Sequence, residues 1–249
     1  MIWKERSDRP VTPFLCGDVM TGRGIDQVLA HPSSPRLHEP YVQSALDYVE
    51  MAESANGRIL KPVDFPYVWG DAAEELTRVS PNARIVNLET SITTCDDYDP
   101  KGINYRMHPA NTPCLTEIDC CVLANNHVLD WGRSGLKETL SSLQAAGMKT
   151  AGPGLNLAQA IQPAVIEIGD NTRVLVFAAC TADSGVPRDW AATDREPGVA
   201  LLPDLSGRTA GRLLALDMTP LEIKRFRLRK SEDRDAYWLR DMLHREGRN

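Results

Sequence analysis

One apolar run, residues 118–124, constrains the fold of this 249-residue chain more than any other stretch. The run ends abruptly in four polar side chains, those of Asn125, Asn126, His127 and Asp130, and a helix-like pattern follows. This order is typical of a buried parallel strand that carries polar groups at its carboxyl end before a helix covers the sheet. Because sites in open α/β sheets form at these carboxyl ends, we interpret the stretch as one wall of a functional site.

Two further predicted strands end in polar side chains in the same way. Residues 11–16 are mostly apolar and are followed by Gly17 and Asp18, and residues 83–88 lead directly to Glu89. Each run has the length and composition of a buried strand. The three strand ends together offer carboxylates, an imidazole and amide oxygens to a common site.

The rest of the chain alternates helix and strand in its first half and is richer in hairpins in its second half. Helices are predicted over residues 21–30, 43–54, 71–79, 134–146 and 156–161, with a last helix that begins at Ser231. Further strands are predicted over residues 148–151, 163–168, 173–179, 199–202, 213–217 and 221–228. Residues 91–116 are predicted as a long polar loop, a kind of loop that is often functional. This pattern predicts a mixed α/β sandwich in a single domain over residues 1–249.

The composition argues against some classes of partner. The net charge of −6 gives no field that favours nucleic acid, and the basic run 224–230 alternates with apolar residues at the period of a strand. No apolar run is long enough to span a bilayer, and the polar start lacks the apolar segment of a signal peptide. None of the six cysteines forms a C-x-x-C pair, which favours free thiols in a reducing compartment. We therefore predict a cytoplasmic protein with no nucleic-acid partner and no membrane span.

The side chains at the strand ends are of the types that bind divalent metals. Carboxylate, amide and imidazole groups suit Mn²⁺, Fe²⁺ or Zn²⁺, and such a metal could activate water and neutralise charge on a phosphoryl oxygen. Each residue also has a purely structural interpretation. Asp18 could cap a helix, and Glu89 could face solvent. Asn126 could be a turn amide, and His127 a hydrogen-bonded core histidine. Their shared position at predicted strand ends favours the site.

Three short motifs carry a resemblance to a known family. They are, in chain order, Gly17-Asp18-Val19-Met20, Asn87-Leu88-Glu89-Thr90 and Ala124-Asn125-Asn126-His127. In this order the motifs resemble the CapA family, the poly-γ-glutamate capsule synthesis proteins of bacteria, which are related to calcineurin-like metallophosphatases. The resemblance covers most of the chain. It implies a metallophosphatase-like four-layer α/β/β/α sandwich with a metal-dependent phosphoesterase-type site at the carboxyl ends of the strands.

The resemblance also implies roles for individual residues. Asp18 matches the first metal carboxylate, and Glu89 matches the carboxylate that bridges two metals. Asn126 and His127 match the Asn-His pair that binds metal and contacts phosphate. The implied metal ligands are thus Asp18, Glu89, Asn126 and His127, and the implied catalytic residues are His127, Asn126 and Asp18. Met20 stands where metallophosphatases place a metal-binding histidine, a departure typical of the CapA branch.

A second departure concerns the late histidines of the family pattern. The only histidine after His127 is His244, and the family-like sequence breaks near residues 210–212, as an internal deletion would produce. The resemblance therefore implies a sandwich that is incomplete in its second half and a dinuclear metal site that lacks some of its ligands.

Two functional classes stay open at this point, and a third option beside them is the binding of an anionic polymer such as polyglutamate through exposed arginines. The first is a metal-dependent hydrolase that acts in capsule polymer metabolism on an anionic polymer or a phosphoester. The second is a catalytically inactive remnant, or an accessory or scaffold protein of a capsule-synthesis complex. Bound metal that depends on Asp18, Glu89 and His127 would distinguish the first from the second.

Overall fold

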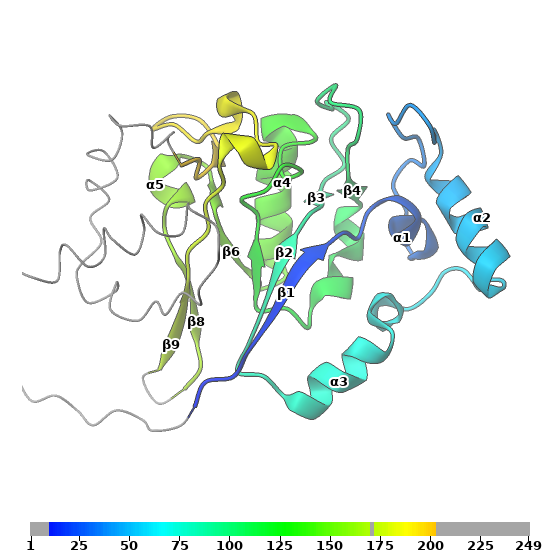
Figure 1. Ribbon diagram of the computed structural model, residues 1–249, viewed down its shortest axis with the longest axis horizontal. Coiled ribbons are helices and arrows are strands. Elements are labelled where there is room, and N and C mark those ends of the chain that lie inside the picture. Colours follow the sequence, from blue (N-terminus) through cyan, green and yellow to red (C-terminus); the bar gives the residue numbers. More distant parts are fainter. Residues whose placement is uncertain (1–9, 170–171, 203–249) are drawn as a thin grey trace, which may run out of the picture. The chain divides into compact units, whose positions relative to one another are not determined.

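The computed structural model describes residues 10–169 and 172–202, and its centre is a four-stranded parallel sheet (Figure 1). The strand order is β1-β2-β5-β6. The strands are β1 (Pro13–Val19), β2 (Ala83–Leu88), β5 (Cys120–Val122) and β6 (Lys149–Ala151). All neighbouring pairs run parallel, so the carboxyl ends of the strands lie at one edge of the sheet. The predicted α/β class is confirmed.

One face of the sheet packs against helices. Val86 of β2 and Leu123, which follows β5, belong to the same buried cluster as Leu136 and Leu143 of helix α4 (Gly132–Ala145). All four side chains are fully buried. Leu136 and Leu143 are two helical turns apart and therefore share one face of α4, as the apolar stripe of this segment predicts.

A β-hairpin covers the opposite face. Strands β8 (Ala164–Glu167) and β9 (Arg173–Val176) pair antiparallel, which confirms the predicted hairpin. Ile166 and Val176 of the hairpin share a second buried cluster with Ile85 of β2. Since neighbouring residues of β2 also belong to the first cluster, this strand is buried on both faces. Burial on both faces explains why its sequence is a nearly continuous apolar run.

Shorter elements complete the described part of the chain. The other α-helices are α1 (Arg23–Val28), α2 (Ala45–Asn56), α3 (Asp71–Val79) and α5 (Leu157–Ala160). The 3₁₀ turns are η1 (Phe65–Trp69), η2 (Pro109–Leu115), η3 (Ala182–Ser184) and η4 (Arg188–Trp190). The two-residue strands are β3 (Ser91–Ile92), β4 (Arg106–Met107), β7 (Pro153–Gly154) and β10 (Gly198–Val199). Helix α3 and strand β2 have the bounds that the sequence predicts.

Strand β1 differs from its prediction. The sequence predicts a buried strand over residues 11–16, whereas β1 runs from Pro13 to Val19 and forms an edge of the described sheet. Leu15 is 70% exposed, and Cys16 is exposed as well. The prediction of burial is wrong because an apolar run has the same pattern at the edge of a sheet as at its centre.

The predicted loop over residues 91–116 is irregular over residues 93–105 and has short regular elements on either side of that stretch. It contains β3 and β4, which pair parallel, and the turn η2. Between β3 and β4 the chain returns to the carboxyl ends of the central strands, where the backbone N–H of Asp99 donates to the carbonyl oxygen of Asp130 at 2.9 Å. The loop therefore supplies side chains to the same region as the three strand ends.

Several predictions fall outside the described residues. They concern the strands over residues 213–217 and 221–228, the last helix from Ser231, the basic run 224–230, His244 and the break near residues 210–212. The four-layer sandwich and the single domain over residues 1–249 therefore stay predictions. Within residues 10–169 and 172–202, no helix combines the length and the apolar character needed to cross a bilayer.

Candidate functional site

A β-bulge in β1 joins the first strand end to the second. The register between β1 and β2 shifts between Cys16 and Asp18, so Gly17 has no partner and Asp18 lies opposite Asn87. The Asn87 side-chain amide donates to Asp18 Oδ1 at 2.6 Å. Asn125, which follows β5, donates in turn to Asn87 Oδ1 at 3.0 Å. Hydrogen bonds between side chains thus link all three strand ends.

His127 is buried at the centre of this cluster, with its ring held by a carboxylate. The side chain of His127 is 7% exposed, and its Nδ1 lies 2.7 Å from Asp130 Oδ2. Because a carboxylate oxygen can only accept, this contact places a ring N–H at Nδ1. His127 Nε2 lies 3.6 Å from Glu89 Oε1. The second nitrogen of the imidazole therefore faces the predicted bridging carboxylate.

Asp130 is the most heavily used acceptor of the cluster. Its side chain is fully buried and accepts a hydrogen bond from the backbone N–H of Tyr105 at 2.6 Å. The Lys101 ammonium lies 2.7 Å from Asp130 Oδ1 and 3.4 Å from His127 Nδ1, and it also donates to the backbone oxygen of Asn126. A buried carboxylate needs such partners to offset its lost hydration. Lys101 supplies the countercharge from within the chain.

Tyr105 stacks on the imidazole of His127, and Arg23 stacks on Tyr105. The Tyr105 ring stacks on His127 with ring centres 3.9 Å apart and planes 22° apart. The Arg23 guanidinium lies 4.7 Å from the centre of the Tyr105 ring. Arg23 is held in place by Glu39, whose Oε1 accepts from Arg23 Nε at 2.6 Å, and Glu39 also accepts from the Tyr48 hydroxyl at 2.8 Å. This stack fixes the plane of the imidazole.

The surroundings of Glu89 favour its neutral form. Burial raises the pKa of Glu89 above its ordinary value, the positive field of His127 and Lys101 lowers it, and the carboxylates of Asp18 and Asp130 raise it further. The raising effects prevail. Glu89 is therefore a carboxyl group whose charge costs free energy in the folded protein.

The raised pKa of Glu89 predicts a pH-dependent effect of Glu89→Gln. A raised folded-state pKa contributes stability that is fully present below the unfolded value and is lost as pH rises through the folded value. We therefore expect Glu89→Gln to gain stability relative to the wild type as pH rises above about 4.5, the ordinary value. Urea unfolding from pH 4 to 8 measures this difference. Glu167→Gln, an exposed change on β8, controls for the loss of one negative charge. A constant difference between Glu89→Gln and the wild type over this range would contradict the prediction.

The predicted metal ligands converge only in part. His127 Nε2 and Glu89 Oε1 face one another, and Asp18 is close enough to affect the pKa of Glu89. Asn126 is fixed through its backbone oxygen, which Lys101 binds. Across residues 10–169 and 172–202, no group of three or more His, Cys, Asp or Glu side chains is arranged to hold a metal ion. The described side chains thus offer two converging donors, short of the complete ligand set that a resident metal needs.

Sequence reasoning missed two members of the cluster. Lys101 and Tyr105 belong to the long segment between β3 and β4, which has no local pattern that marks a site residue. The only signal was the length of that segment, which is typical of functional loops. Asp130 belongs to the motif after β5, but its role as the shared acceptor depends on contacts that the sequence does not display.

Comparison with known proteins matches the chain to a protein family. A family model described as bacterial capsule synthesis protein PGA_cap matches residues 12–235. Two proteins described as probable polyglutamine synthesis accessory proteins, from the CDC 1551 and H37Rv strains of Mycobacterium tuberculosis, are each 44% identical to the chain over 201 residues. The matched region is 80% of this chain and 53% of each relative. The chain therefore spans about half the length of the curated relatives that it matches.

Proposed function

The chain belongs to the PGA_cap family of bacterial capsule synthesis proteins, and we propose that it acts as an accessory protein in the synthesis of a poly-γ-glutamate capsule polymer. The description of its mycobacterial relatives as probable accessory proteins supports this role. In this proposal the strand-end cluster organises a binding surface for the polymer or for another member of the synthesis machinery. The proposed role does not include catalysis by the residues of this cluster.

The observation that carries the proposal is the internal charge balance of the cluster. The Lys101 ammonium lies 2.7 Å from the fully buried Asp130 carboxylate and 3.4 Å from the imidazole of His127. A cation of the chain therefore already balances a carboxylate next to the predicted metal ligands. A divalent ion bound by His127 and Glu89 would be repelled by this ammonium group.

Deletion of the gene in the bacterium that carries it tests the accessory role. We expect the amount of capsular polymer to fall on deletion and to recover when the wild-type chain is expressed. Glu89→Gln should restore the polymer as well, because the proposed role does not require a charged carboxylate at the strand ends. The measurement is polymer mass per cell, with immunoblots to show equal protein levels. An unchanged polymer level in the deletion strain would contradict the proposal.

A metal-dependent phosphoesterase is the second candidate, and one observation favours it. Asp130 holds the Nδ1 side of His127 while Nε2 faces Glu89 at 3.6 Å. In metal sites a carboxylate commonly orients a histidine ligand in this way. The matching test is the metal content of the purified wild type and of Asp18→Ala, Glu89→Ala and His127→Ala, after exposure to Mn²⁺, Fe²⁺ or Zn²⁺. Near-stoichiometric metal that all three variants lose would favour this candidate, whereas a folded wild type that retains no metal would count against it.

A further inference from the structure

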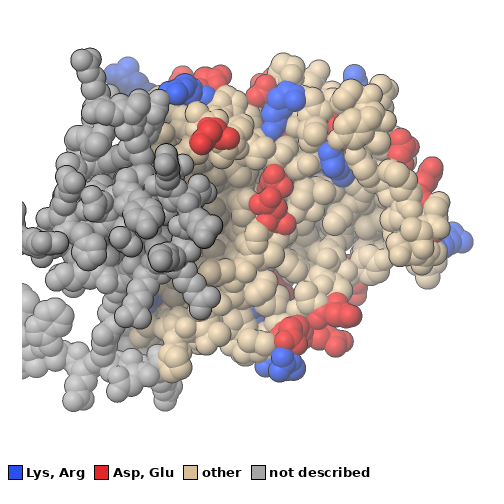
Figure 2. Space-filling model, in the orientation of Figure 1, with Lys and Arg blue, Asp and Glu red and all other residues tan. Residues whose placement is uncertain are grey.

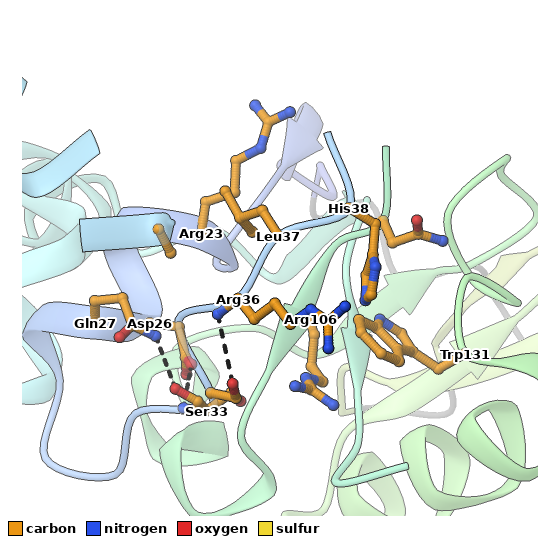
Figure 3. Close-up of a pocket in the computed structure, with 12 residues that line it drawn as sticks. Arg23, Asp26, Gln27, Ser33, Arg36, Leu37, His38, Arg106 and Trp131 are labelled. Carbon is orange, nitrogen blue, oxygen red and sulfur yellow. Dashed lines mark hydrogen bonds between the residues drawn. The ribbon is translucent and has the colours of Figure 1, made fainter. Parts of the chain in front are cut away.

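A second polar site, which we call the arginine pocket, borders the strand-end cluster. Arg23 and Asn104 line it, and the Asn104 side chain donates to the carbonyl oxygen of Asp130 at 3.1 Å. The pocket is a small cavity of about 20 Å³ whose lining includes Ser33, Arg36, His38, Asn104, Arg106 and Trp131 (Figure 3). Arg36, Leu37 and His38 also line an open depression of about 370 Å³. We propose that the arginine pocket and this depression bind a carboxylate-bearing polyamide chain, with one carboxylate against the guanidinium groups of Arg36 and Arg106.

The two arginines give the pocket its positive charge. The Arg106 side chain is 9% exposed and lies over the Trp131 ring, 4.0 Å from its centre. Its ion-pair partner, Asp96, is 88% exposed, so water screens that pair. Arg36 makes no ion pair with any residue that the structure describes. Burial lowers the pKa of His38, and the charges of Arg36 and Arg106 lower it further, which is consistent with a positive field in the pocket.

Two acidic side chains, Asp26 in the lining of the pocket and Glu39 in the lining of the depression, already have hydrogen-bond partners within the protein. Asp26 Oδ1 accepts from the backbone N–H of His108 at 3.0 Å and from the side chain of Asn111 at 2.8 Å, and its Oδ2 accepts from the backbone N–H of Ser33 at 2.7 Å. Glu39, beside the depression, pairs with Arg23 at 2.5 Å. Charge-assisted hydrogen bonds of this kind hold both carboxylates in place. They leave Arg36 available to an anionic ligand.

Two buried polar atoms indicate which hydrogen-bonding groups the ligand carries. Ser33 Oγ and Asn104 Oδ1 belong to residues that line the pocket, and both atoms are buried without a hydrogen-bond partner among the described residues. A buried polar atom of this kind calls for a partner. A hydroxyl can donate to a carboxylate oxygen, whereas an amide oxygen requires a donor such as an amide N–H. A carboxylate adjacent to an amide N–H satisfies both atoms, and a fully ionised phosphate has no donor for Asn104.

The size of the cavity fits this assignment. A space of about 20 Å³ holds little more than one small polar group, so the rest of the ligand must lie in the open depression. On the molecular face that Figure 2 shows, Lys and Arg side chains are interspersed with Asp and Glu. Selectivity for an acidic chain would thus come from the arginine pocket. The identity of the chain as a γ-linked glutamate polymer rests on the proposed function.

Isothermal titration of the purified full chain with a short γ-linked glutamate oligomer tests the proposal. We expect binding that Arg36→Gln weakens by about tenfold, because a hydrogen bond to a charged group is lost. Arg36 is exposed, so this change should leave the fold intact. Ser33→Ala should also weaken binding without lowering the Tm of the free protein, since its hydroxyl has no partner to lose. Arg195→Gln, an exposed arginine outside the pocket lining, is the matched control and should bind as the wild type does.

Four results would overturn the proposal. The first is no binding of the oligomer by the wild type, and the second is equal binding by Arg36→Gln. The third is equal binding of the same oligomer with its carboxylates amidated. The fourth is tighter binding of inorganic phosphate with the same dependence on Arg36. Because the titration uses purified protein, its outcome is independent of polymer yield in cells.

Discussion

Replacing Asp130 by alanine is expected to lower the free energy of unfolding by about 3–5 kcal/mol, the range for breaking a buried ion pair. The carboxylate is fully buried and serves Lys101, His127 and the backbone N–H of Tyr105 together. Its loss would leave the buried N–H of Tyr105 without its acceptor and the Lys101 ammonium without its countercharge. Urea denaturation at pH 7 measures the change.

The same experiment should include variants that separate charge from packing. Asp130→Asn keeps an oxygen for Tyr105 but loses the negative charge, and its stability should lie between those of the wild type and Asp130→Ala. Asp183→Ala removes an exposed carboxylate of η3 and should remain within about 0.5 kcal/mol of the wild type. If Asp130→Ala were as stable as Asp183→Ala, the cluster would not be held together by this carboxylate.

Leu123→Ala should cost about 2–5 kcal/mol of stability, as large-to-small changes in a packed core do. Leu123 is fully buried in the cluster that joins the sheet to α4. Its backbone N–H donates to the carbonyl oxygen of Ala151 at 3.0 Å, so the backbone should stay in place while the side chain leaves a cavity. Thermal and urea unfolding of the variant measure the loss.

A matched leucine on the surface provides the control for this prediction. Leu60 is 76% exposed, and Leu60→Ala should change the free energy of unfolding by less than about 0.5 kcal/mol. Because Leu123 precedes the turn that carries Asn125 and His127, its replacement should also loosen the strand-end cluster. Equal stabilities of the two variants would show that this face of the sheet is not packed as described.

The sequence by itself determined the elements whose patterns are local. The continuous apolar run of β2, the stripe on α4 and the hairpin turn between β8 and β9 each depend on residues that are close in the chain. The polar residues that follow β2 and β5 were found in the same way, because the end of an apolar run is a local signal. The family resemblance rested on those same short motifs, and the match over residues 12–235 confirms it.

Only the tertiary structure decided which of these residues meet and what holds them. Strand β1 lies at the edge of the described sheet, and the bulge at Gly17 turns Asp18 toward Asn87. Lys101 reaches Asp130 from a segment with no periodic pattern, and Arg36 and Arg106 share a pocket although they are far apart in the chain. Such contacts depend on strand order and loop path, which set distances between residues that are remote in sequence. The hydrophobic period and the composition of a segment depend only on residues that are close in the chain. They therefore leave the distances between remote residues undetermined.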